Sequence, residues 1–375
     1  MNRWEAFQFI CAALRASLAR ERLDIPSGID WTEIIAQAGA HWVTPMMAPA
    51  LVSHAEVPSD VREYLAAVQT LTVQRASMQR SQIAEVTAAL RRAGVQPVLL
   101  KGAAALAQGL APVPGAQLMA DIDVLVDDAK MEQSRNALTA CGYRQHKQRA
   151  PLVRDVASER SPDLALDHER HHDPPFLPGA TGVSVELHRA LFEPAFRALL
   201  PAHDALRRAT PVSVSEMEFS VLAPTDRAVH YVVHAQLHHA GAERGIGNLR
   251  QLVDLAAFVD GFGREIDWTD VEDRFAAHGH AGVLADYLAY LAILLDRRVP
   301  ARISNVEMVM ARLRASIEAT TTEVSAKPGE TIGAIASEYW TRFRQQPSLA
   351  INLLDPRFWP SRLHGWHDRL RQGRS

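Results

Sequence analysis

The chain of 375 residues is long enough for two or three domains, and its 47% hydrophobic and 22% charged residues are typical of a folded globular protein. Its formal net charge of −3 excludes the global positive field of a protein that coats nucleic acid, although a local basic groove stays compatible with it. The only cysteines, Cys11 and Cys141, exclude a disulfide framework and fit a reducing compartment.

Apolar spacing predicts helices over residues 1–94. The first stretch, "MNRWEAFQFICAALRASLARER", is charged throughout and lacks the apolar core and cleavage site of a signal peptide. A second, long helix is predicted to begin at the capping residue Ser59 and to end at Gly94. The most apolar later run, "VLADYLAYLAILL", is too short to cross a bilayer and contains Asp286. We therefore expect a cytoplasmic protein with no membrane partner.

The residue pattern changes at "VQPVLLKGAAALAQGL". Residues 95–100 predict a compact strand, Gly102 a turn and residues 103–108 the start of a helix. A loop, "APVPGAQ", then leads to the strand "DIDVLV" and to a helix in "DDAKMEQSRNALTACGY", which starts at an aspartate cap and ends at Gly142. Strand, helix, strand, helix in this order predicts an α/β unit.

Beyond this unit the pattern is less regular. Residues 144–180 are polar and rich in histidine and proline, "GVSVELHRALF" restores an alternating strand, and from "TPVSV" onward helices are predicted to dominate, with Thr225 as a cap. We predict a helical region at 1–94, an α/β core at 95–205, a helical domain at 206–320 and a C-terminal extension at 321–375 of unassigned role.

The stretch "LMADIDVLV" places two aspartates in an otherwise apolar strand. Residues i and i+2 of a strand share a face, so Asp121 and Asp123 point the same way while Ile122 and Val124 point into the core. Paired carboxylates in a low-dielectric site take up a proton unless a cation neutralises them. Mg²⁺ prefers such oxygen ligands, but a bare D-x-D also fits a solvated strand end.

Two neighbouring features add chemistry to this pair. Lys101 and Gly102 stand at a strand-to-helix turn, where free N–H groups and a flexible cation can hold an anion, although an ordinary turn explains them equally well. In "VSVELH", Glu186 lies between apolar residues and shares its strand face with His188. An acid at that interior position needs a cation or another partner.

Together, "LLKGAAAL", "DIDVLV" and "VSVELH" resemble the nucleotidyltransferase superfamily of the DNA polymerase β type, and more narrowly a mostly uncharacterised bacterial group with an LLKG…DID…ELH pattern. The resemblance is specific from Val98 to Arg189 and weaker from His234 to Leu255. It implies an α+β fold, with a nucleotidyltransferase-type mixed β-sheet core flanked by N-terminal and C-terminal helical regions. It also implies transfer of a nucleotidyl group from a nucleoside triphosphate to a hydroxyl acceptor, with release of pyrophosphate.

The resemblance also implies roles for individual residues. Asp121, Asp123 and Glu186 are expected to be catalytic and to hold two Mg²⁺ ions, with Mn²⁺ as the alternative. The nucleotide is expected to contact Lys101 and Gly102. The candidates for lining the cleft are His188 and His234. Two departures from the pattern, Ala103 in place of a glycine or serine and Gln117 in place of an arginine, leave nucleotide affinity and activity open.

The histidines admit a competing interpretation. "HERHH", from His168 to His172, formally matches the zinc motif H-E-x-x-H, but Pro174 and Pro175 would cut a helix there, so we expect a loop or an edge strand. His230, His234 and His238 recur every four residues and form one stripe of a helix, which packing explains without a catalytic role. On a later helix Arg250 and Asp254 have the spacing of a same-helix ion pair.

Two alternatives remain at this stage. The chain could be a non-catalytic, regulatory nucleotide-binding module, or a toxin-like transferase that modifies RNA or protein. The sequence specifies neither the nucleotide nor the acceptor, for which a small molecule, a peptide, a protein and an RNA all provide a hydroxyl.

Overall fold

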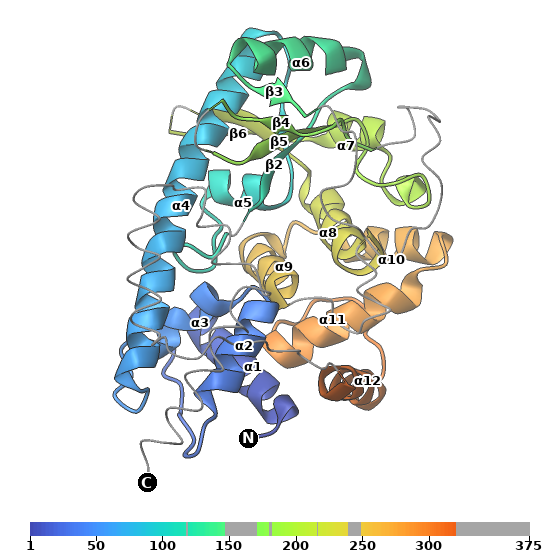
Figure 1. The fold of residues 1–375 in the computed structure, drawn as a ribbon. Helices are drawn as coiled ribbons and strands as arrows, with labels where there is room; N and C mark the ends of the chain where they lie inside the picture. Colours follow the sequence, from blue (N-terminus) through green and yellow to red (C-terminus); the bar gives the residue numbers. More distant parts are fainter. Residues whose placement is uncertain (118, 147–170, 180–181, 216, 239–248, 320–375) are drawn as a thin grey trace.

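The computed structural model describes residues 1–117, 119–146, 171–179, 182–215, 217–238 and 249–319. It has an α+β fold in which a mixed sheet is flanked by helices from both ends of the described chain (Figure 1). Within the described part of the chain, every helix is too short or too polar to span a bilayer. The helices are α1 (Arg3–Ala19), α2 (Trp31–Ala40), α3 (Thr44–Leu51), α4 (Ser59–Arg92), α5 (Lys101–Gln108), α6 (Met131–Ala140), α7 (Ala202–Arg208), α8 (Pro224–Val232), α9 (Leu249–Phe262), α10 (Trp268–Ala277), α11 (Ala281–Leu295) and α12 (Val306–Ala319).

The sheet has the order β3-β4-β5-β2-β1-β7-β6. Strands β2 and β5 run parallel, and β1 pairs with β2 antiparallel and with β7 parallel. The strands are β1 (Val98–Leu99), β2 (Asp121–Leu125), β3 (Arg144–Gln145), β4 (Phe176–Leu177), β5 (Ser184–His188), β6 (Thr210–Val214) and β7 (Met217–Val221).

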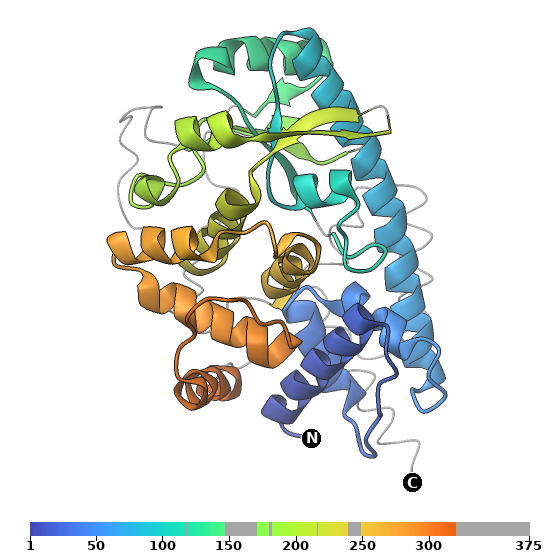
Figure 2. The ribbon, with the colours of Figure 1, turned by 180° about the vertical axis from the view of Figure 1, so that it is seen from behind.

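Helix α4 is the longest element, with 34 residues, and it runs along one side of the molecule from the N-terminal helices to the sheet (Figures 1 and 2). Its first part packs on α3 and its last part on α5, α6 and β7. The predicted limits at Ser59 and Gly94 agree with the observed helix, although Pro58 and not Ser59 occupies the cap position, and Gly94 adopts a φ of 70° just beyond its end. A single rigid helix therefore connects the N-terminal helices to the sheet.

Two apolar cores lie on either side of the central strands. One face of the sheet, including Ile122, Val124, Val185 and Leu187, packs against α4, α5 and α6. The second core joins α1–α3 to the helices α8–α12, so the two helical regions bury their apolar faces against each other. Because side chains alternate along a strand, the residues between the buried ones on β2 and β5 turn away from the first core.

Two local expectations were wrong. "TPVSV" does not precede helices directly, because it forms the hairpin strand β6, which pairs with β7 at the edge of the sheet. Thr225 does not cap α8, whose first residue is Pro224. Its hydroxyl instead accepts a hydrogen bond from the backbone N–H of Asp267, at 2.9 Å. The domain boundaries remain predictions.

Candidate active site

The parallel pairing of β2 with β5 brings together acids that are 63 positions apart in sequence. In this register Asp123 lies opposite Glu186, Asp121 opposite Ser184, and Leu125 opposite His188. The alternation predicted for each strand therefore places Asp121, Asp123, Glu186 and His188 on one face. Asp123 and His188 are buried, and Asp121 and Glu186 are partly exposed.

Asp123 is the centre of this group. Its Oδ1 atom accepts hydrogen bonds from Lys101 Nζ, at 2.9 Å, and from His188 Nε2, at 2.7 Å. Burial alone would raise the pKa of Asp123, but the charge on Lys101 and the hydrogen bond from His188 outweigh it and hold the pKa well below its ordinary value. Burial also lowers the pKa of His188 in spite of its carboxylate partner, so the imidazole is neutral near pH 7 and donates from Nε2. Asp123 is therefore a charged carboxylate in this group.

The two flanking acids behave differently. Burial, followed by the charge on Asp123, raises the pKa of Glu186 to about 7, and the same two causes raise that of Asp121 to about 7. Lys101 acts on both carboxyl groups in the opposite direction but is not sufficient to cancel the effect. One ammonium group thus faces three acids, and the site has more negative charge than its own cation neutralises. Such a site favours an additional cation.

Among the described residues, one group has the arrangement expected of metal ligands. It consists of Asp123, Glu186 and His188. One ligand atom from each lies within 4.8 Å of the others. His188 was predicted only as a cleft-lining residue, although its position two residues after Glu186 already places it on the same strand face. Asp121 lies on this face but outside the tight group, so its predicted metal-binding role remains a prediction.

Lys101 is positioned by an unusual backbone conformation. It is the first residue of α5 and adopts a φ of 46°, in the left-handed region. Burial lowers its pKa, but Asp123 and Asp121 more than compensate, so the pKa lies above its ordinary value and the amine is charged. The charged amine therefore points at the acids from the start of the helix.

Gly102 has a packing role in this structure. A Cβ atom at this position would lie 2.7 Å from Met119 Cγ and 2.9 Å from its Sδ, both too close for contact. The missing side chain therefore makes room for Met119, in the loop before β2. The predicted contact of Gly102 with a nucleotide remains a prediction.

A line of imidazoles extends from the acids toward α8. His172 Nδ1 lies 3.7 Å from Glu186 Oε2, and residue 172 forms an isolated β-bridge with His188. The rings of His171 and His238 have centroids 5.4 Å apart, and those of His234 and His238 are stacked at 5.5 Å. His172 lies in the segment that was expected to form a loop or an edge strand before the Glu186 strand, and its contact with Glu186 depends on the pairing of two distant segments.

The zinc-motif interpretation is not supported by the described part of "HERHH". His172 forms a bridge with a strand instead of a helical turn, and β4, three residues after Asp173, lies between β3 and β5 and so is not the expected edge strand. His168 lies outside the described residues. His234 is in the π-helical turn Val233–His238, where Gln251 Nε2 is 3.1 Å from its Nδ1. The expected ion pair of Arg250 with Asp254 is confirmed, with Nε and Oδ2 3.9 Å apart.

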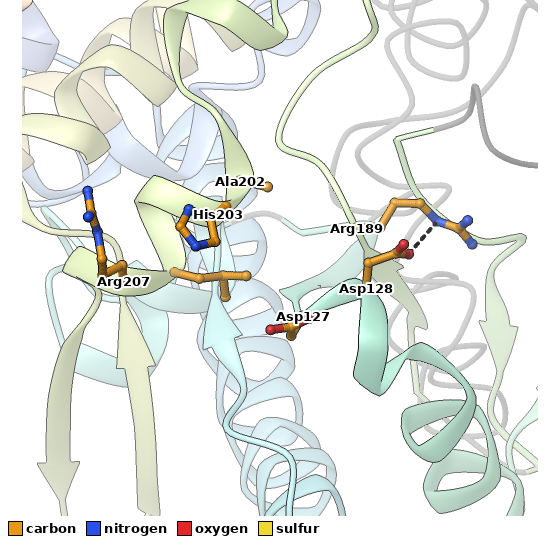
Figure 3. A pocket seen from close by; sticks show the side chains of 7 residues that line it. Asp127, Asp128, Arg189, Ala202, His203 and Arg207 are labelled. Carbon is orange, nitrogen blue, oxygen red and sulfur yellow. Dashed lines mark ion pairs between the residues drawn. The ribbon is translucent and has the colours of Figure 1, made fainter.

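A separate cavity of about 480 Å³ lies at the carboxyl ends of β2 and β5 (Figure 3). Arg189 and Asp128 lie on one side of it and form an ion pair at 3.8 Å, and His203 and Arg207 of α7 lie on the other. Its lining residues are Asp127, Asp128, Arg189, Ala202, His203, Leu206 and Arg207. None of the predicted site residues is among them.

Comparison with known proteins identifies the family of the chain. A family model described as an uncharacterised nucleotidyltransferase matches residues 27–296, which include the whole sheet and all the acids. No curated protein and no solved structure matches the chain. With most of its length matched, the chain belongs to this uncharacterised nucleotidyltransferase family.

Proposed function

We propose that the protein is a metal-dependent nucleotidyltransferase that uses Asp121, Asp123 and Glu186. The observation that carries this is the charged Asp123, held between Lys101 and His188 and directly opposite Glu186 on the neighbouring parallel strand. A carboxylate with a purely structural role would be neutralised by its own hydrogen-bond partners. This one has two further acids beside it, each with a pKa raised to about 7.

The donor set fits a divalent ion. Three carboxylates on one face suit Mg²⁺, which prefers oxygen ligands, and the neutral imidazole of His188 beside Asp123 and Glu186 also suits Mn²⁺. Bound ions would neutralise charge on the phosphates and lower the pKa of an acceptor hydroxyl. The surplus of acids over cations supports one or two such ions.

The proposed reaction is an in-line displacement at phosphorus. The hydroxyl oxygen of the acceptor attacks the α-phosphorus of a nucleoside triphosphate, and the bond from that phosphorus to the oxygen bridging to the β-phosphorus breaks. Pyrophosphate leaves with this oxygen. Glu186 would hold an ion beside the acceptor hydroxyl, which lowers the pKa of that hydroxyl so that its proton passes to solvent as the oxygen attacks. Lys101 neutralises charge beside Asp123, and the acceptor is a hydroxyl compound of any of the classes considered above.

Replacing Asp123 by Asn tests the proposal, because the amide keeps the shape and removes the charge. The control is Asp128→Asn, at a carboxylate whose side chain is 71% exposed in the separate cavity. Thermal unfolding of each protein is followed with all four nucleoside triphosphates, with Mg²⁺ or Mn²⁺ and in chelator. We expect metal and nucleotide to stabilise the parent and Asp128→Asn alike, since a ligand that binds only the folded state stabilises it.

Asp123→Asn should lose this stabilisation, and pyrophosphate release with a suitable acceptor should fall by about a hundredfold or more. An equal metal response in parent and Asp123→Asn would contradict the proposed metal site. A parent that responds to no triphosphate at millimolar concentration would favour the non-catalytic module.

A further inference from the structure

Helix α4 brings a buried cation to the entrance of β2. Arg75 is 8% exposed, and its Nη2 atom donates a hydrogen bond to the carbonyl oxygen of Met119, two residues before Asp121. The same carbonyl accepts a second hydrogen bond from Gln79 Nε2, at 2.9 Å. Two side chains of a rigid helix therefore fix the backbone that leads into the acidic strand, and one of them is charged.

Arg75 differs from several other arginines of the described chain, which pair with buried carboxylates. Arg208 and Arg274 both pair with buried Asp226, and Arg135 and Arg189 both pair with buried Asp173. For Arg75, by contrast, no carboxylate lies within ion-pairing distance in the described part of the chain, and its hydrogen bond goes to a neutral carbonyl. A buried charge without a counter-ion is costly, so the environment of Arg75 favours an anion.

A second guanidinium approaches the same place from α9. Arg250 donates its backbone N–H to the carbonyl of His41, and its Nε lies 3.9 Å from Asp254, which also accepts a hydrogen bond from Gln117. Burial lowers the pKa of Arg75 to about 10, and the nearby charge of Arg250 contributes to that shift. The charge of Arg250 also acts on Asp121, where it opposes the rise in pKa. Arg250 pairs with Asp254, which holds Gln117, and Arg75 holds Met119, so the two arginines are linked through the same short loop before β2.

We infer that Arg75 and Arg250 form the subsite for the phosphate tail of the nucleoside triphosphate, on the Asp121 side of the acids. This inference rests on the proposed function. The fork of a guanidinium matches phosphate oxygens, and hydrogen bonds between ionised groups are stronger than neutral ones. The tail would lie between α4 and α9, and the opposite side of the site, near Glu186 and His172, is left for the acceptor. Gln117, which stands where the family pattern has an arginine, contacts Asp254 and not Asp121 or Asp123. Arg75 and Arg250 would supply the positive charge that an arginine at position 117 would have provided.

The test compares Arg75→Gln with Arg80→Gln. Arg80 lies on the same helix and also donates to a backbone carbonyl, that of Leu106 at 2.9 Å, but along α5 and away from β2. Calorimetric titrations measure the affinity of each protein for inorganic tripolyphosphate, and for the triphosphate and monophosphate of each base with Mg²⁺. Binding of Mn²⁺ alone, followed by its paramagnetic resonance signal, reports separately on the acids.

We expect Arg75→Gln to bind tripolyphosphate and the preferred triphosphate at least about tenfold more weakly, as expected for the loss of a hydrogen bond between charged groups. Monophosphate and Mn²⁺ affinity should stay within about twofold, so the advantage of triphosphate over monophosphate shrinks, which a merely structural role would not produce. Arg80→Gln should match the parent. Arg250→Gln, on a less buried side chain, should show the same selective loss and serves as the second variant if Arg75→Gln does not fold.

Unchanged triphosphate affinity in Arg75→Gln and Arg250→Gln would overturn the inference. So would an equal loss for triphosphate and monophosphate. A parent that binds tripolyphosphate through Arg75 but no nucleoside triphosphate would keep the anion subsite and contradict the proposed function instead. A parent that binds neither would overturn both.

Discussion

Two buried aspartates of this protein have opposite electrostatic surroundings. Asp226, on α8, accepts hydrogen bonds from Nε and Nη2 of Arg208, at 2.8 and 2.9 Å, and a third from Nη1 of Arg274 at 2.8 Å. Asp123, on β2, has one ammonium and one neutral imidazole, and two further acids stand beside it. At Asp226 two arginines, Arg208 and Arg274, are matched by two acids, Asp226 and Asp270, and the cluster ties α7, α8 and α10 together. At Asp123 acids exceed cations, so the site favours binding of a further cation.

The difference shows how a structural ion cluster can be distinguished from a functional one. Burial alone does not separate them, since Asp226 is 1% and Asp123 3% exposed. The balance of charge around the carboxylate does separate them. A balanced cluster should respond to the loss of a partner and ignore metal, whereas an unbalanced cluster should respond to metal and to pH.

The largest expected effect on stability is at Asp226. Asp226→Asn removes the counter-charge of Arg208 and Arg274, and breaking a buried pair on one side costs about 3–5 kcal/mol. Urea unfolding should show this loss of stability equally in chelator and in Mg²⁺. A matched change at Asp204, whose pair with Arg207 is exposed, should cost less than about 1 kcal/mol. If metal restored the stability of Asp226→Asn, the proposed difference between the Asp226 and Asp123 clusters would be wrong.

A smaller effect of the same kind is expected at Lys101. Lys101→Met removes the ammonium hydrogen bond to Asp123, and leaving a charged acceptor with one partner fewer costs about 1–3 kcal/mol in chelator. Divalent metal should restore part of this loss, because it supplies positive charge to the same carboxylates. Unfolding curves in chelator and in Mn²⁺ provide the measurement, with Lys130→Met, at an exposed lysine of the 3₁₀ turn Asp128–Lys130, as the control. Equal losses of stability with and without metal would mean that Lys101 stabilises the fold and has no part in metal binding.

The pH dependence of Glu186 sharpens the comparison further. Its pKa is raised in the folded protein from an ordinary value of 4.5 to about 7, so the charged form is disfavoured by folding. The parent should therefore lose stability as the pH rises from about 4.5 to about 7, and Glu186→Gln should lose less, because only Asp121 still titrates in this range. Above pH 7 in chelator the variant should be more stable by roughly 1–3 kcal/mol, and below pH 4.5 the two should coincide.

Urea titrations at successive pH values measure this difference, and Glu218→Gln, at a more exposed glutamate of β7, provides the control. With Mn²⁺ the order should reverse, because the parent alone offers the ion its third ligand. Parallel pH curves for parent and Glu186→Gln would mean that the carboxyl group is already neutralised.

The smallest effect is expected at Gly102. A Cβ atom there would meet Met119 Cγ at 2.7 Å, and overpacking of this kind costs about 1–3 kcal/mol, offset in part by the better helix propensity of alanine. Gly102→Ala should thus be mildly destabilised, and a second change, Met119→Ala, should relieve the clash. If Gly102→Ala is stable but loses triphosphate affinity, the glycine serves the nucleotide and not the packing.

The sequence alone determined the local features of the site. Strand alternation places Asp121 with Asp123, and Glu186 with His188, whatever the rest of the chain does, because the side-chain period of a strand is two. Helix signals also predicted α4 within two residues at each end. The hairpin β6–β7 was not predicted, because a short edge strand is stabilised by the strand beside it and has little signal of its own.

Everything that makes these residues a site depended on the tertiary structure. The register that sets Asp123 opposite Glu186, the β-bridge that brings His172 to the acids, and the approach of Arg75 from a helix 44 positions before Met119 all join distant segments. The pKa values of Asp121 and Glu186 likewise depend on burial and on neighbours that no single segment contains. Side-chain period is a local property of the backbone, whereas contacts and desolvation arise only when separate elements pack together.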